Sequence, residues 1–173
     1  FRIIFPFSST SKLIIKLASD ISRLPSTRRF TDVLLERAAS GKIGVIAEIK
    51  KASPSAGVIS ENFNPVEKAK EFESVGAAAL SILTEEDFFL GCIDYLKAVK
   101  MTTSLPILRK DFIFDEYQIY ERKVYQADII LLIVSVLSDD QLKNYLDISK
   151  ELNLDVIIET HDITEIQRAM KLN

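Results

Sequence analysis

The stretch that decides the fold is Val45-Ile-Ala-Glu-Ile-Lys-Lys-Ala-Ser-Pro-Ser55. Side chains of a strand alternate between two faces, so positions 45, 47 and 49 form a wholly apolar face. Glu48 and Lys50 lie on the other face, where burial of a charge is costly unless the charge is paired or used. We therefore predict a strand that delivers charge to a site. The loop that follows, 51–57, is rich in small and turn-forming residues and would expose backbone donors near a ligand.

Composition predicts one globular domain with a sizeable core. The chain has 173 residues, 47% of them hydrophobic, and a formal charge of -3, which indicates neither disorder nor a basic nucleic-acid surface. The single cysteine, Cys92, permits no internal disulfide and fits a reducing compartment; we interpret it as a packing residue. One histidine and one cysteine form no metal cluster without recruiting carboxylates.

Two amphipathic helices are expected before the first strand, at Ser11–Leu24 and Phe30–Ser40, and form an N-terminal helical extension over residues 1–43. The chain opens on Phe1 rather than Met, which suggests removal of an upstream segment. The apolar run near the start is too short to span a bilayer. We expect a cytoplasmic protein, with the remnant of an organellar leader as the alternative.

From residue 44 onward, strand-like runs alternate with helical patterns five times. The runs begin near Val45, Ala78, Pro106, Asp128 and Asp155. This alternation is typical of a parallel sheet covered by helices, either an open doubly wound sheet or a closed barrel. The dinucleotide fingerprint and the P-loop are both absent after the first strand, which favours a TIM (β/α)8-barrel type of α/β fold.

Charged residues fall at the carboxyl ends of the expected strands, where barrels carry their sites. Each charge alone has an equally good structural explanation, such as an ion pair or a helix cap. A barrel would bring four of them to one mouth, together with Phe89 and Phe112, and so provide groups for acid and base chemistry on a flat substrate. The four are Glu48, Lys50, Lys110 and Glu159.

Three other features have simple structural explanations. His161 is interpreted as a loop or helix-capping residue, and Phe88-Phe89 can be core under a loop. The run Thr84-Glu-Glu-Asp87 is interpreted as a solvated acidic turn rather than a metal site.

Five segments resemble, in order, the motifs of indole-3-glycerol phosphate synthase. They are Ile46-Ala-Glu-Ile-Lys-Lys-Ala-Ser-Pro-Ser55, Leu80-Ser-Ile-Leu-Thr-Glu-Glu-Asp-Phe-Phe-Leu-Gly91, Pro106-Ile-Leu-Arg-Lys-Asp-Phe112 with Tyr117-Gln-Ile119, Ala127-Asp-Ile-Ile-Leu-Leu-Ile133 and Ile158-Glu-Thr-His161. The resemblance implies a carboxy-lyase of tryptophan biosynthesis that needs no cofactor and no metal. Its substrate would be 1-(2-carboxyphenylamino)-1-deoxyribulose 5-phosphate, a phosphorylated small molecule, with no role for nucleic acid or membrane.

The resemblance also implies a role for each matching residue. Lys110 would be the general acid and Glu159 the base or proton relay, while Glu48 would orient and balance the lysines. Lys50 would hold the phosphate or share in proton donation, and Ser53 would lie next to the phosphate. Three residues would pack on the anthranilate ring: Phe89, Phe112 and Leu131.

The resemblance covers only part of that family's barrel, because residues 44–173 supply about five β/α units of the eight. We expect this polypeptide alone to be inactive or nearly so, and to self-associate through open sheet edges. Fusion or contact with other tryptophan-pathway enzymes is a further expectation. The alternatives are a non-catalytic partial barrel that serves as an interaction module, and another phosphosugar barrel enzyme such as phosphoribosylanthranilate isomerase.

Overall fold

The structure of the protein is a computed structural model that describes residues 17, 21 and 23–172. The first expected helix, Ser11–Leu24, therefore lies largely outside the described residues. The second is present as α2, Phe30–Ala39. None of the helices in the described part is both long enough and apolar enough to cross a membrane.

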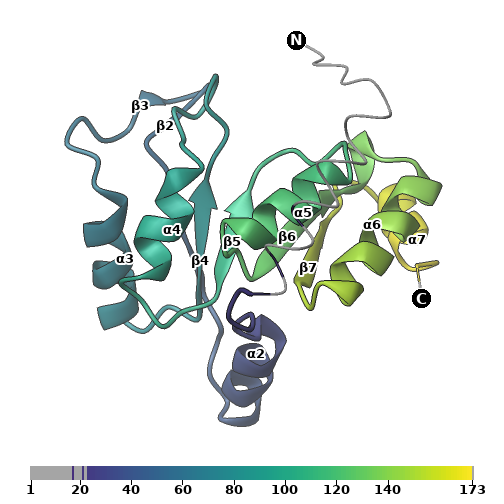
Figure 1. Ribbon diagram of the computed structural model, residues 1–173, viewed down its shortest axis with the longest axis horizontal. Helices are drawn as coiled ribbons and strands as arrows, with labels where there is room; N and C mark the ends of the chain where they lie inside the picture. Colours follow the sequence, from purple (N-terminus) through teal and green to yellow (C-terminus); the bar gives the residue numbers. More distant parts are fainter. Residues whose placement is uncertain (1–16, 18–20, 22, 173) are drawn as a thin grey trace.

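Five parallel strands form one sheet in the order β1-β4-β5-β6-β7 (Figure 1). Their bounds are Ile46–Ile49, Ala79–Leu83, Ile107–Lys110, Ile129–Ile133 and Asp155–Glu159. The helices that follow the strands are α3 Pro65–Ser74, α4 Asp94–Lys100, α5 Tyr117–Val124, α6 Asp139–Glu151 and α7 Ile163–Ala169, with a 3-10 turn η1 at Val134–Val136. The predicted alternation is confirmed, and the architecture is that of a partial TIM-barrel type.

A short hairpin occupies the loop after β1. It pairs β2, Ala52–Ser53, with β3, Gly57–Val58, in antiparallel fashion. Gly57 is the first residue to pair after the turn, and its φ of 64° is a value that favours glycine. The sequence predicted a loop here, and the structure adds two backbone pairs to it.

Local sequence signals set the helix starts. The Asn64 side chain accepts hydrogen bonds from the backbone N–H groups of Val66 and Glu67, and Pro65 occupies the first helical position of α3. Ser138 forms a reciprocal capping box with Gln141 at the start of α6. These caps direct each chain segment from the top of a strand back along the sheet.

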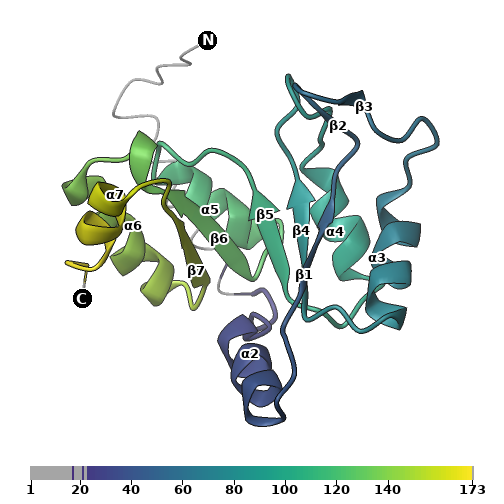
Figure 2. The same cartoon turned by 180° about the vertical axis from the view of Figure 1, so that it is seen from behind.

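The two faces of the sheet bury different partners. Helices α3 to α6 cover one face, and α2 lies at the foot of the other (Figure 2). Ile49, Leu80 and Ile82 pack toward α3 and α4, as the apolar face predicted for β1 requires. Leu108, Ile129 and Leu131 point to the opposite, concave face, where Phe30 and Leu34 of α2 close its lower end. The upper end of that face is left to the site.

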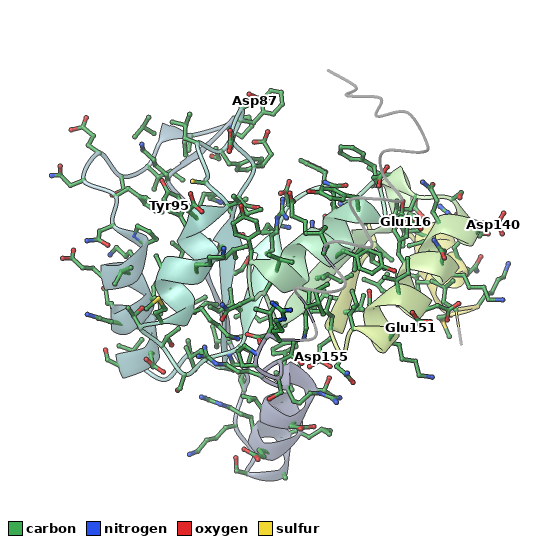
Figure 3. All side chains as sticks on the ribbon, in the orientation of Figure 1. Asp87, Tyr95, Glu116, Asp140, Glu151 and Asp155 are labelled. Atoms are coloured by element: carbon green, nitrogen blue, oxygen red, sulfur yellow. The ribbon has the colours of Figure 1, made fainter. Side chains whose placement is uncertain are left out.

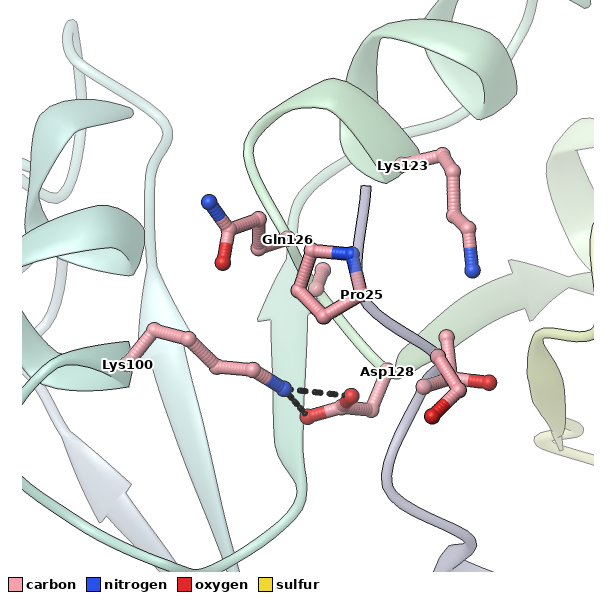
Figure 4. Close-up of a pocket in the computed structure, with 8 residues that line it drawn as sticks. Pro25, Lys100, Lys123, Gln126 and Asp128 are labelled. Atoms are coloured by element: carbon pink, nitrogen blue, oxygen red, sulfur yellow. Dashed lines mark hydrogen bonds and ion pairs between the residues drawn. The ribbon is translucent and has the colours of Figure 1, made fainter. Parts of the chain in front are cut away.

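Two aspartates, the buried Asp128 and the partly buried Asp155, tie α2 to the amino ends of the strands. Asp155, labelled beside α2 in Figure 3, accepts hydrogen bonds from the backbone N–H groups of Phe30 and Thr31. Asp128 accepts from the backbone N–H groups of Arg28 and Ile107 and forms a buried ion pair with Lys100 (Figure 4). Burial lowers the pKa of Lys100, and the bond to Asp128 partly offsets that effect.

The cavity beside this ion pair is too small for a ligand. It measures about 10 Å³, the size of one water molecule, and Pro25, Lys123 and Gln126 contribute to its walls (Figure 4). Burial also lowers the pKa of Lys123. We assign this end of the sheet to stability.

Candidate active site

The larger cavity lies at the opposite end, above the carboxyl ends of β4 to β7. It measures about 210 Å³. Its walls combine apolar and aromatic side chains with an ammonium and three carboxylates: Leu83, Glu85, Phe89, Lys110, Asp111, Phe112, Leu131, Ile133 and Glu159. A concave site of mixed character, with few convergent charges, is typical of small-molecule binding.

An ion pair crosses this cavity. The Lys110 Nζ lies 3.0 Å from the Glu159 Oε2. Lys110 ends β5 and Glu159 ends β7, and both strands pair with β6, so the bond spans an intervening strand. Parallel neighbours are about 4.8 Å apart, and only long side chains on the same concave face can bridge two such spacings. Both side chains are about one-third exposed, which leaves the pair accessible to a ligand.

The aromatic residues expected around a substrate ring are placed beside this pair. Phe89, Phe112 and Leu131 all contribute to the cavity wall. Leu131 is 3% exposed and belongs to the concave core, whereas Phe112 is 43% exposed at the rim. The structure thus brings five of the sequence-predicted site residues together.

Glu48, Lys50 and Ser53 stand apart from that cavity wall. The Lys50 Nζ lies 2.7 Å from the Glu48 Oε1, so these two charges satisfy each other at the carboxyl end of β1. The Ser53 Oγ accepts a hydrogen bond from the backbone N–H of Ala56 within the hairpin. The physical reason is that the Lys50 charge is satisfied within its own strand, and β4 lies between β1 and β5. Both ion pairs nevertheless lie at the same end of one sheet.

A buried polar network lies behind Lys110, and we did not predict it from the sequence. The Arg109 guanidinium donates to the Thr84 hydroxyl, the Asp111 carboxylate and the Glu121 carboxylate. Thr84 in turn donates to Asp111 at 2.8 Å. Strand alternation is the signal that would have found it, because Arg109 must face opposite to Lys110. The network fixes the end of β5 and so the direction of the lysine.

Arg122 lies fully buried under this network. One of its Nη atoms donates to the Arg109 carbonyl at 3.4 Å, while its Nε and other Nη have no partner among the described residues. Burial and the neighbouring Arg109 charge lower the pKa of Arg122. The side chain supports the strand end from the helix side and does not reach the cavity.

Glu85, also missed as a site residue, shapes the loop that carries Phe89. Its carboxylate accepts hydrogen bonds from the backbone N–H groups of Asp87, Phe88 and Phe89. Gly91 closes the loop, and a Cβ there would lie 2.5 Å from the Leu83 carbonyl oxygen. Phe88 is 64% exposed, so the alternative explanation, core under a loop, does not hold for it. The acidic run therefore serves as a turn, and no group of metal-ligating side chains gathers within the described residues.

Fold and site together define a protein of the (β/α)-barrel class, with a lysine–glutamate ion pair at the carboxyl ends of its strands. The family model for indole-3-glycerol phosphate synthase matches residues 8–173, and the chain belongs to that family. Relatives with that name include proteins of Carboxydothermus hydrogenoformans, 53% identical over 86% of this chain, and Polaromonas naphthalenivorans, 50% identical over 84%.

The chain spans about half the length of these relatives, 55% of the first and 56% of the second. Among solved structures, the crystal structure of MenC from Desulfotalea psychrophila resembles it with a TM-score of 0.52 at 10% identity. That likeness covers 81% of this chain and 37% of MenC, and it concerns the fold alone.

Proposed function

We propose that the protein acts as an indole-3-glycerol phosphate synthase in tryptophan biosynthesis. It would close the ring of 1-(2-carboxyphenylamino)-1-deoxyribulose 5-phosphate with loss of carbon dioxide and water. The observation that carries the proposal is the Lys110–Glu159 pair, 3.0 Å apart in a cavity walled by Phe89, Phe112 and Leu131. Family membership supports the same activity.

In this proposal Lys110 is the general acid. Its ammonium donates a proton to the ribulose carbonyl oxygen while the carboxyl-bearing ring carbon attacks the carbonyl carbon. The new hydroxyl keeps that proton, and the bond to the departing carbon dioxide returns its electrons to the ring. The Lys110 ammonium at the cavity stabilises the negative charge that develops on the carbonyl oxygen.

Glu159 is the base for dehydration. Its carboxylate removes the proton from the carbon next to the hydroxyl-bearing carbon. As a proton relay, Glu159 then passes this proton to the hydroxyl, which leaves as water while the ring double bond forms. The position of Glu159 beside Lys110 supports this division of roles, because one group can accept a proton while the other donates.

The second ion pair supplies charge near the phosphate side. Lys50 would hold the phosphate or share in proton donation, and Glu48, 2.7 Å from it, would orient and balance the lysines. Ser53 would lie next to the phosphate in the hairpin. The contact between Glu48 and Lys50 supports the balancing role.

The test is the activity of the full-length protein with Lys110→Ala, measured by the fluorescence of the indole product. We expect kcat to fall by about 10²-fold to 10⁴-fold, the range for loss of a general acid. Lys143→Ala, at an exposed position of α6, is the matched control and should retain wild-type activity. A Lys110→Ala protein with more than about a tenth of wild-type kcat would refute the proposal.

The chain spans only about half the length of these relatives, and this favours a second candidate function for a polypeptide limited to these residues. Strands β1 and β7 each have a neighbour on one side only within the described sheet. Such edges can pair with another chain, so a 173-residue polypeptide would serve as an interaction module. We also propose that the protein contacts other tryptophan-pathway enzymes and that it is cytoplasmic. The free thiol of Cys92 fits a reducing compartment.

A further inference from the structure

We propose that His161 is a positioning residue for Glu159. Its imidazole holds the second oxygen of that carboxylate, so Glu159 keeps its orientation when Lys110 turns to the substrate. This inference rests on the proposed function and adds a residue to its site.

The contacts place the Glu159 carboxylate between two side-chain nitrogens. Its Oε2 lies 3.0 Å from the Lys110 Nζ, and its Oε1 lies 3.2 Å from the His161 Nε2. The two oxygens are therefore held separately, one by the proposed acid and one by the imidazole. A carboxylate gripped at both oxygens has its plane fixed.

The imidazole is itself anchored on the start of α7. Glu165, in the first turn of that helix, accepts a hydrogen bond from the His161 backbone N–H at 2.8 Å, and its carboxylate lies 3.3 Å from the ring Nδ1. Asp162 fixes Glu165 in turn, since the Asp162 side chain accepts from the Glu165 backbone N–H. The capping position that the sequence suggested for His161 is thus filled by Asp162. With its Nδ1 beside Glu165, the His161 ring contacts Glu159 through its Nε2.

The need for such a residue follows from the chemistry of Lys110. When its ammonium donates to the substrate carbonyl, the bond to Glu159 must weaken or break. Glu159 is about one-third exposed, and without a second partner it could rotate toward solvent. A general base acts only within hydrogen-bond reach of its proton, and small errors of orientation can lower the rate by up to about 10²-fold.

Three variants of the full-length protein distinguish a positioning role of His161 from a purely structural role. The amide nitrogen of glutamine reaches about as far as the Nε2 of histidine, toward Glu159, whereas that of asparagine reaches only as far as the Nδ1, toward Glu165. We expect His161→Gln to keep kcat within about threefold of wild type. We expect His161→Asn and His161→Ala to lower kcat by about tenfold or more, with KM changed less than about twofold. Equal kcat in all three, or no rescue by glutamine, would overturn the inference.

A second measurement does not depend on turnover. His161 is the single histidine of the sequence, so its ring resonances in an NMR spectrum need no assignment against others. Glu159→Gln should shift these resonances, whereas Glu71→Gln, at an exposed position of α3, should leave them unchanged. An unchanged ring signal in Glu159→Gln would overturn the contact and the inference with it.

The outcomes also distinguish the two proposals. If Lys110→Ala is inactive while His161→Ala retains wild-type kcat, the positioning role fails and the proposed function stands. If Lys110→Ala remains active, the proposed function fails and the role of His161 in it fails as well.

Discussion

Replacing Asp128 should destabilise the protein strongly, because its carboxylate is 1% exposed and serves three donors. One oxygen accepts from the Arg28 backbone N–H at 2.7 Å, the other from the Ile107 backbone N–H at 2.9 Å, and both contact the Lys100 ammonium. Asp128→Asn leaves one acceptor oxygen and turns amide protons toward a buried backbone donor. It also leaves the 8%-exposed Lys100 side chain without a counter-charge.

An unsatisfied buried donor costs about 1–3 kcal/mol, and breaking a buried ion pair costs about 3–5 kcal/mol in all. We therefore expect Asp128→Asn to lower the free energy of unfolding by about 3–5 kcal/mol. With a urea m-value of about 2 kcal/mol/M, the unfolding midpoint should fall by about 2 M. Circular dichroism at neutral pH follows the transition.

A double-mutant cycle tests the stated cause. Lys100→Met removes the ammonium that Asp128→Asn leaves unpaired, so adding it to that variant should cost little further stability. Lys143→Met, at an exposed position of α6, is the control and should leave the midpoint within error of wild type. An Asp128→Asn protein within about 1 kcal/mol of wild type would refute the reasoning.

Three further outcomes are expected. Hydrogen bonds from Ser104 lower the pKa of Glu73 from its ordinary value. The stabilisation is therefore full above the pKa of the unfolded state and is lost as the pH falls through the lowered pKa of the folded state. Glu73→Gln should lower the melting temperature at about pH 7 and match wild type at about pH 2. Gly91→Ala should displace the loop that carries Phe89, because the new Cβ would meet backbone atoms, and raise KM severalfold with little change in melting temperature. A polypeptide of these 173 residues alone should sediment as a dimer or larger species and turn over substrate at less than about a hundredth of a full-length homologue's rate; a clean, active monomer would contradict both expectations.

Most of the fold could be predicted because the signals for it are local. The alternation of apolar runs with capped helical patterns, such as Asn64-Pro65 and Ser138, determines where strands end and helices begin. The hairpin after β1 and the contacts of Asp128 and Asp155 with the segment around α2 could not be predicted in this way. The aspartate contacts join residues about 100 or more positions apart, and no periodicity in the sequence indicates such a pair.

For the candidate site, the sequence predicts which face of the sheet each side chain is on, but not how far apart the side chains lie. Period-two alternation puts Lys110 on the concave face and Arg109 on the other, and the strand ends carry the charges to one edge. Which charges meet depends on strand order and curvature. That is why Lys110 reaches Glu159 across β6 while Lys50 stays with Glu48 on β1.

Exposure separates the ion pairs at the two ends of the sheet into different roles. The Lys100 and Asp128 side chains are 8% and 1% exposed, so neither can leave the other without an uncompensated buried charge. The Lys110 and Glu159 side chains are 32% and 31% exposed, so water can solvate either charge when the pair separates. Exchange of partners therefore costs little free energy. In the proposed function, Lys110 and Glu159 exchange partners during turnover, whereas Lys100 and Asp128 stay paired. The burial of each lysine–carboxylate pair determines how readily its ion pair is broken. The buried pair can therefore hold the amino end of the sheet rigid, while the more exposed pair at the carboxyl end can separate during the proposed reaction.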